Sequence, residues 1–335
     1  MRLLYTCISG LQDVVRAIVE EDSGHRVIKV LDGALICEAE HPSRAGCFNN
    51  TFEILLERPF AGKNVLDRMM AEALVPGIKL PLFHMKGMGS TFRIVSSMEN
   101  KLVAVNAASK ARLEQLIAKR TGLHVERAGA DVEFWLYSRS EGLAFLLRRL
   151  SYGRVTERSL QKGELRPELC WCLNWLSRPS DADVFLDPFA GSGAIPLARM
   201  QMGGFKKLYA FDSDPAKGEA IGKRLGLDDR IEACAQEMEA LALSGVTAVV
   251  TDPPWGFFEQ IDVGALYEQM WQKLMEISAA DARYVILAAR TEEMQQAIDA
   301  QPGIALEQTY SILVNGKKAG ICVARREGKM NHDKS

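Results

Sequence analysis

The stretch that most constrains the fold is an apolar run that ends abruptly at residues 251–256. Strand-type residues 246–250 lead directly into Thr251, an acid, two prolines and an aromatic residue. Two consecutive prolines donate no backbone hydrogen bonds and disfavour helical geometry, so the strand must end there and the next peptide groups stay extended. The sequence therefore predicts a carboxylate, a free carbonyl and a flat ring at one edge of a sheet.

These three groups suit a planar heterocycle that carries an exocyclic amine. Asp252 and the carbonyl of Pro253 can each accept one N–H of the amine, while Trp255 can stack on the ring. Acceptors that draw the hydrogens out of the ring plane would localise the nitrogen lone pair toward an electrophile. The alternative is a proline-stiffened loop whose Trp255 belongs to the core. We predict Asp252, Pro253, Pro254 and Trp255 as catalytic residues.

Composition narrows the class of protein. A chain of 335 residues is long enough for two domains, and its net charge of -2 gives no global sign of nucleic-acid binding, so any basic surface must be local. Seven cysteines are scattered without a CxxC pair or histidines at metal-ligand spacing, which argues against a disulfide scaffold and a metal site. No apolar run is long enough for a membrane span, and the first residues do not resemble a signal peptide. We expect a soluble, cytoplasmic protein.

The first 150 residues predict a mixture of helices and strands. The order strand, helix, strand, strand indicates a small α+β domain, with these elements over residues 3–8, 10–21, 26–30 and 34–39. Alternation then continues around 52–56, 65–73 and 85–95. A helix over 107–121 and a strand over 131–137 follow.

Basic residues gather between positions 101 and 158. Such a group could be the solvated face of a helix or a phosphate-binding surface on an otherwise slightly acidic protein. The candidate RNA-binding residues are Lys110, Lys119, Arg120, Arg148, Arg149 and Arg154.

This part of the chain resembles the THUMP domain together with its preceding ferredoxin-like domain, an RNA-binding pair found in RNA-modifying enzymes. The resemblance rests on the helix up to Lys119-Arg120-Thr121-Gly122-Leu123 and on the segment 129–136. It implies a ferredoxin-like domain over 1–60, a THUMP-like domain over 61–150 and a linker over 151–164. By the same resemblance, the partner is structured RNA, tRNA foremost, held by its acceptor end.

A second signal is a strand over 184–187 that runs into a glycine-rich turn. Gly191 and Gly193 would let the backbone pass close to a ligand, although a tight turn without ligand is the alternative. Pro196 stands where the third glycine of a dinucleotide fingerprint would be, which disfavours a nicotinamide cofactor. Asp187 at the strand end suits a cationic group such as the ammonium of an amino acid.

The next two strands end near further acids. Asp212 follows a strand over 207–211 and can take both hydroxyls of a ribose, whereas Asp214 is expected to cap the helix that starts at Pro215. Glu237 follows a strand over 231–235, where an adenine amine could be read. Ammonium, ribose and adenine together predict S-adenosylmethionine as the cofactor.

The remaining order completes a sheet. We expect a helix over 264–279, a strand over 284–288, a helix over 292–300, and two strands, 307–314 and 320–324, around Asn315-Gly316, which is a strong hairpin signal. The predicted fold class is α/β. It comprises a Rossmann-like class I methyltransferase domain with a seven-stranded sheet ending in an antiparallel hairpin, preceded by the α+β ferredoxin-like plus THUMP module. The tail 327–335 is expected to be disordered.

Residues 165–326 resemble the class I methyltransferases that modify exocyclic amines of nucleobases. The resemblance rests on the motif Asp187-Pro188-Phe189-Ala190-Gly191-Ser192-Gly193, on Asp212, and on Asp252-Pro253-Pro254-Trp255. In such enzymes a Leu-Arg-Pro sequence before the first helix lies over the cofactor pocket, which implicates Arg166; a plain surface residue is the alternative. The implied cofactor-binding residues are Asp187, Phe189, Gly191, Gly193, Asp212, Glu237 and Arg166.

As a whole the chain resembles the THUMP-type tRNA guanine-N2-methyltransferases of bacteria and archaea, which act at position 6 of the acceptor stem. Those enzymes often have Asn, and Tyr or Phe, where this chain has Asp252 and Trp255. An adenine-N6 or ribosomal-RNA guanine-N2 methyltransferase, or an inactive RNA-binding protein, remain as alternatives. No obligate protein partner is evident, and a monomer is compatible with domains that present RNA to one another.

Overall fold

The computed structural model describes residues 1–60, 62–82, 89–151, 160–161, 163–226, 228–256 and 262–327. The chain divides into two compact units, the first formed by Met1–Cys7, Val19–Arg44 and Phe48–Arg154, the second by Ile8–Ile18, Ala45–Cys47 and Val155–Ser335. Within the described ranges, every helix is too short or too polar to cross a lipid bilayer. Most of the linker predicted over 151–164 and all but one residue of the tail predicted over 327–335 lie outside the described residues.

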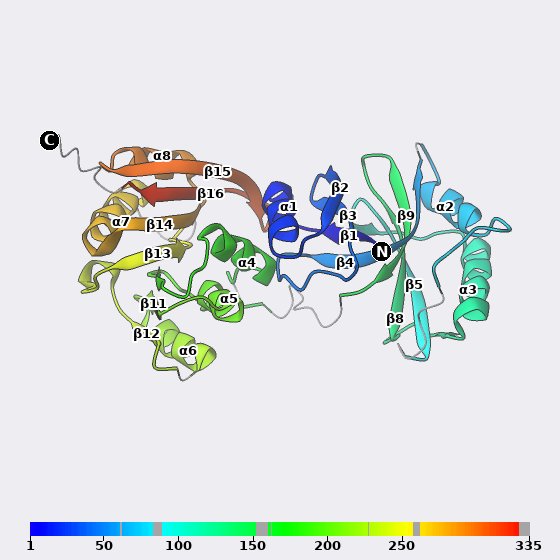
Figure 1. Ribbon diagram of the computed structural model, residues 1–335, viewed down its shortest axis with the longest axis horizontal. Coiled ribbons are helices and arrows are strands. Elements are labelled where there is room, and N and C mark those ends of the chain that lie inside the picture. The colour runs from blue at the N-terminus through cyan, green and yellow to red at the C-terminus, as the bar shows by residue number, and fades with distance from the viewer. Residues whose placement is uncertain are drawn as a thin grey trace. The chain divides into compact units, whose positions relative to one another are not determined.

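The first unit is built on one mixed sheet (Figure 1). Among the described residues the strand order is β2-β3-β1-β4-β9-β8-β5-β6, with β7 beside β5. The strands are β1 (Arg2–Thr6), β2 (Arg26–Leu31), β3 (Ala34–Glu38), β4 (Asn50–Pro59), β5 (Thr91–Met98), β6 (Lys101–Leu102), β7 (His124–Val125), β8 (Val132–Ser138) and β9 (Leu143–Arg149). Because β4 pairs with β9, strands from both domains predicted in this half form a single sheet.

Two elements of this unit were not predicted from the sequence. Residues Val65–Ala73, for which the sequence pattern predicted no type of element, form helix α2, because Leu66, Met69, Met70 and Ala73 bury one helical face. Strand β9 was not anticipated, because its apolar run is buried on both faces of the sheet and shows no alternation.

The helix expected over 107–121 is confirmed as α3 (Ala107–Thr121). The side chain of Asn106 accepts a hydrogen bond from the backbone N–H of Ser109 at its start, and Gly122 with φ of 77° ends it. Both α2 and α3 contribute to a core against β5 and β8. Helix α1 (Gln12–Glu21) is likewise close to its predicted bounds.

The second unit contains the sheet that positions the candidate site. Its order among the described residues is β12-β11-β10-β13-β14-β16-β15, in which the first five strands are parallel and β16 is antiparallel to both of its neighbours, β14 and β15. The strands are β10 (Val184–Asp187), β11 (Lys207–Asp212), β12 (Ile231–Ala235), β13 (Val246–Thr251), β14 (Ser278–Ala288), β15 (Ile304–Val314) and β16 (Lys317–Arg326). Asn315 and Gly316 have φ of 51° and 79°, which confirms the predicted tight hairpin.

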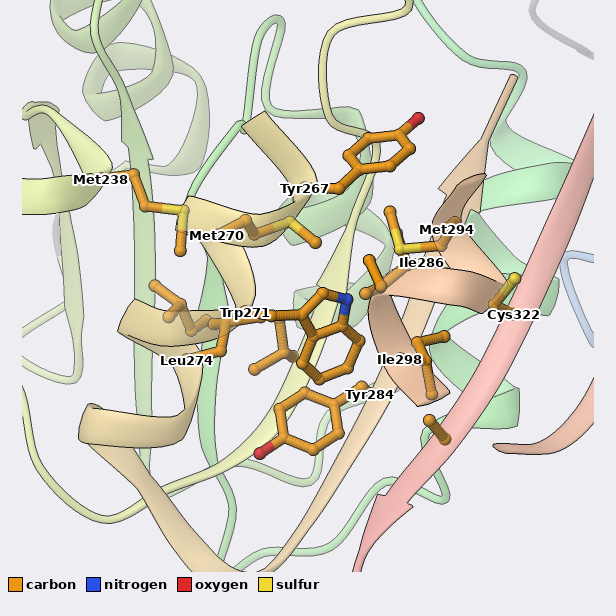
Figure 2. Close-up of a cluster of buried hydrophobic side chains, with 14 of the residues drawn as sticks. Met238, Tyr267, Met270, Trp271, Leu274, Tyr284, Ile286, Met294, Ile298 and Cys322 are labelled. Carbon is orange, nitrogen blue, oxygen red and sulfur yellow. The ribbon is translucent and has the colours of Figure 1, made fainter. Parts of the chain in front are cut away.

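Helices flank this sheet, with bounds α4 (Pro167–Leu176), α5 (Ala194–Met202), α6 (Pro215–Leu225), α7 (Val263–Ile277) and α8 (Thr291–Asp299). Asp214 caps α6 as expected, since its side chain accepts from the backbone N–H of Ala216 at 2.8 Å. Figure 2 shows the core beneath α7, where Trp271 meets Tyr284 of β14 edge to face with ring centroids 4.9 Å apart. This aromatic contact fixes α7 on the parallel part of the sheet.

A partly buried ion pair and a hydrogen bond hold the start of two parallel strands together. The guanidinium of Arg199, fully buried on α5, lies 2.5 Å from Asp183, just before β10. Asp183 also accepts from the hydroxyl of Thr247 in β13 at 3.1 Å. Strands β10 and β13 are therefore tied at the end opposite to the candidate site.

Candidate active site

The carboxyl ends of four neighbouring parallel strands hold the predicted acids. Strand β10 ends at Asp187 and β11 at Asp212, while β12 is followed by Glu237 and β13 by Asp252. The strands lie in the order β12-β11-β10-β13, so these ends meet at one edge of the sheet. In open α/β sheets this edge is where ligands bind.

Asp187 is fully buried, and its two carboxylate oxygens are treated differently by the chain. Its Oδ1 accepts from the Thr251 hydroxyl at 2.6 Å and from the backbone N–H of Phe189 at 3.2 Å. Its Oδ2 has no hydrogen-bond partner among the described residues. Burial raises the pKa of Asp187 to about 7, against the lowering effect of those two hydrogen bonds.

The glycine-rich turn is fastened to the neighbouring strand. Gly191 and Gly193 have φ of 54° and 77°, which only glycine adopts readily. The backbone N–H of Gly191 donates to Asp212 Oδ2 at 3.0 Å, and that of Ala190 donates to the carbonyl of Phe211 at 2.8 Å. Asp212 Oδ1 accepts from the N–H of Asp214, so the carboxylate is held rigidly at the strand end.

An arginine that sequence reasoning missed also fixes this turn. Arg224 of α6 donates to the carbonyl of Ser192 at 2.8 Å and to the Glu164 carboxylate at 2.6 Å. The side chain of Glu164 is almost fully buried. Arg224 stands in the last turn of α6, 32 residues from Ser192, so no local pattern could have revealed the contact.

The Asp252 loop forms a hydrogen-bonded unit of its own. Trp255 Nε1 donates to Asp252 Oδ1 at 2.6 Å, so the indole stands beside the carboxylate. Pro253 is buried, whereas Asp252, Pro254 and Trp255 are half-buried. Burial raises the pKa of Asp252 to about 7, although the Trp255 hydrogen bond lowers it. Residues 257–261 lie outside the described residues.

The acids at this edge shift the pKa values of two further buried side chains, Cys170 and Tyr267. Burial raises the pKa of the Cys170 thiol on α4, and the charges of Asp252 and Asp187 raise it further. The pKa of Tyr267 on α7 is also raised by burial and by Asp252. Burial and the neighbouring carboxylates therefore act in the same direction on both groups, and a cationic ligand at this edge would be favoured by the carboxylates.

The other predicted cofactor residues have weaker links to this cluster. Phe189 is half-buried against the core of the unit, and Glu237 is exposed after β12. Arg166 precedes α4, is half-exposed and lies 3.5 Å from Glu168. Their roles toward a cofactor stay predictions.

The residues at the edge fit the predicted cofactor. The unpartnered, buried Oδ2 of Asp187 lacks a donor that an ammonium group would supply. Asp212 presents a carboxylate beside the glycine turn, as hydroxyl recognition requires.

The predicted RNA-binding residues of the first unit fall into two groups. Lys119 and Arg120 are exposed in the last turn of α3, and Lys110 is half-buried near its start. Arg148 is buried and lies 2.7 Å from Glu53, while Arg149 lies 2.9 Å from Glu133. Arg154 lies outside the described residues. RNA binding by any of them stays a prediction.

Comparison with known proteins gives the class of the C-terminal part. Residues 154–319 match the family model of the UPF0020, RMKL-like methyltransferase domain. This match identifies the part of the chain that carries the acids as a methyltransferase domain, and it supports S-adenosylmethionine as the cofactor. No curated protein sequence matches the chain.

Solved structures share the fold along nearly the whole chain. TrmN from Thermus thermophilus is 18% identical, with a TM-score of 0.75 over 97% of this chain and 99% of that one. SMU.472, a putative methyltransferase complexed with SAH, is 14% identical, with a TM-score of 0.71 over 98% of each chain. A predicted N6-adenine-specific DNA methylase from Listeria monocytogenes is 15% identical, with a TM-score of 0.67 over 98% of this chain and 96% of that one. These likenesses confirm the class I methyltransferase-like α/β fold.

Proposed function

We propose that this protein transfers a methyl group from S-adenosylmethionine to the exocyclic N2 amine of a guanosine in tRNA, in the acceptor stem. One observation carries the proposal. The acid suited to the cofactor's ammonium, Asp187, is hydrogen-bonded to Thr251, the residue directly before Asp252. The candidate cofactor acid and the candidate amine acceptor therefore adjoin at one sheet edge.

The loop residues have chemistry that suits an exocyclic amine. S-adenosylmethionine supplies a methyl group on a sulfonium, so positioning accounts for most of the required catalysis. Asp252 would accept one amine N–H and take the proton that the nitrogen loses as it bonds to the methyl carbon and the carbon–sulfur bond breaks. A pKa of about 7 suits that role near neutral pH. The hydrogen bond from Trp255 to Asp252 would keep the indole ring within stacking distance of the nucleobase whose amine Asp252 accepts.

The first unit would supply the RNA-binding surface. Lys119 and Arg120 are exposed in the last turn of α3, at its C-terminal end, where phosphate groups could reach them. Arg148 and Arg149 are already engaged by Glu53 and Glu133, so we assign the phosphate contacts to α3 first.

Nucleoside analysis tests the proposal. Purified protein would be incubated with S-adenosylmethionine and an unmodified tRNA pool, and the digested RNA analysed by mass spectrometry. We expect N2-methylguanosine with the native protein and none with Asp252→Ala, while S-adenosylhomocysteine binding persists in both. Asp252→Asn is the matched variant, because it keeps an acceptor for the Trp255 N–H. Loss of cofactor binding in a folded Asp252→Ala protein would contradict the assigned role.

Adenine-N6 methylation is the second candidate. An Asp-Pro-Pro-aromatic loop can accept the amine of either base, and one structure with the same fold is titled a predicted N6-adenine-specific DNA methylase. N6-methyladenosine in the same assay would keep the loop assignment and overturn the base. A product on ribosomal RNA alone would overturn tRNA as substrate, and no product on either RNA would favour the inactive RNA-binding protein.

A further inference from the structure

One hydrogen bond joins the two functional strand ends of the second unit. The Thr251 hydroxyl at the end of β13 donates to Asp187 Oδ1 at the end of β10, and the two oxygens are 2.6 Å apart. Both residues are completely buried, and β10 and β13 are adjacent parallel strands. The contact is therefore shielded from water, and a hydrogen bond to a carboxylate is stronger in such an environment than in water.

This bond divides the carboxylate into a fixed oxygen and an available one. Oδ1 already receives the Thr251 hydroxyl and the Phe189 N–H, whereas Oδ2 receives no donor among the described residues. A buried oxygen without a donor is costly, and such groups persist in proteins where a ligand completes them. Rotation of the Asp187 side chain would break two hydrogen bonds, so the chain holds Oδ2 in place before any ligand arrives.

We propose, on the basis of the function proposed above, that Thr251 is a positioning residue that aims Asp187 Oδ2 at the ammonium of the cofactor and couples this contact to the Asp252 loop. Thr251 is suited to both tasks because its side chain contacts Asp187 while its carbonyl carbon is bonded to the nitrogen of Asp252. A cofactor held by Asp187 thereby also favours one placement of the residue that receives the amine.

Thr251→Val tests this role, because it removes the hydroxyl and keeps the shape. Binding would be measured by calorimetry with two probes. S-adenosylhomocysteine carries the aminoacyl ammonium, and 5′-methylthioadenosine lacks the amino-acid end. We expect Thr251→Val to bind S-adenosylhomocysteine about tenfold more weakly and 5′-methylthioadenosine as well as the native protein does. Thr251→Ser, which restores the hydroxyl, should bind both probes within about threefold of native affinity.

The same strand offers a matched control. Thr247, the second residue of β13, donates to Asp183, which precedes β10, and accepts from the backbone N–H of Val184. Thr247→Val therefore removes a threonine–aspartate hydrogen bond and a backbone contact between the same two segments. Because that bond lies at the other end of the strands, we expect Thr247→Val to leave the affinity for both probes unchanged.

The outcomes separate the inference from the function on which it rests. Native affinity of Thr251→Val for S-adenosylhomocysteine would overturn the inference, and so would an equal loss of affinity for both probes, since a merely structural role weakens both. The inference stands if the loss is confined to S-adenosylhomocysteine and serine rescues it, whichever base is methylated. A native protein that binds neither probe would overturn the proposed function and, with it, the role of Thr251.

Discussion

Asp187→Asn should make the protein more stable at alkaline pH while it removes cofactor binding. Burial raises the pKa of Asp187 from an ordinary 3.8 to about 7 in the folded protein. Between about pH 4 and pH 7, Asp187 is therefore protonated in the folded state and ionised in the unfolded state. The stabilising effect of this protonation is complete below about pH 4 and is lost as the pH rises to about 7.

The size of the effect follows from the same values. A pKa difference of one corresponds to about 1.4 kcal/mol, so the raised pKa of Asp187 lowers the stability of the folded state, relative to acidic pH, by about 4 kcal/mol at pH 8 and by about 2 kcal/mol at pH 5. Asparagine keeps an acceptor for Thr251 and Phe189 but buries an amide without an acceptor, which costs about 1–3 kcal/mol at any pH. The stability of Asp187→Asn relative to the native protein should therefore increase by about 2 kcal/mol between pH 5 and pH 8.

Urea unfolding followed by tryptophan fluorescence would measure this change. Four of the five tryptophans belong to the second unit and report on it: Trp171, Trp175, Trp255 and Trp271. Asp262→Asn is the control for the loss of one negative charge, since it replaces an exposed helix-capping carboxylate by another good capping residue. A difference between Asp187→Asn and native protein that is equal at pH 5 and pH 8 would refute the reasoning. We also expect Asp187→Asn to lose most of its affinity for S-adenosylhomocysteine.

Two further variants test the support of the site and the RNA-binding surface. Gly218→Ala should lower the stability of the protein and weaken cofactor binding, because a Cβ atom there would lie 2.2 Å from the backbone nitrogen of Ala235 and would push α6 away from β12. Thermal unfolding would measure the stability and calorimetry the cofactor affinity. An unchanged melting temperature would contradict this prediction. Lys119→Glu combined with Arg120→Glu should weaken tRNA binding by about tenfold or more and reduce its salt dependence. Filter binding at two salt concentrations would measure the affinity and its salt dependence. Lys29→Glu, at an exposed position on β2, is the control. Equal weakening by Lys29→Glu would show that net charge alone is responsible.

The order of the C-terminal elements could be predicted because each signal is local. A strand that ends in a glycine turn, a strand that ends at Asp212, and Asn315-Gly316 between two apolar runs each specify backbone geometry within a few residues. Parallel strands connected by helices then bring their carboxyl ends to one edge, which is why acids far apart in the sequence could be assigned to one site.

The N-terminal half was less predictable, because burial there is set by distant partners. Strand β9 has no alternation, since both of its faces are covered, and α2 shows its helical period in only nine residues. The charge of Arg148 and Arg149 likewise gave no sign that Glu53 and Glu133 would engage them across the sheet.

The sequence alone determined which chemical groups stand at the strand ends: a carboxylate beside a glycine turn, a second carboxylate on the next strand, and an acid followed by two prolines and an indole. The tertiary structure alone decided how those groups are bonded to one another. The Thr251 hydroxyl reaches an acid 64 residues away, Asp187 keeps one oxygen without a donor, and Arg224 fastens the glycine turn from a helix. Such contacts depend on strand order and burial, which arise only when distant segments pack together.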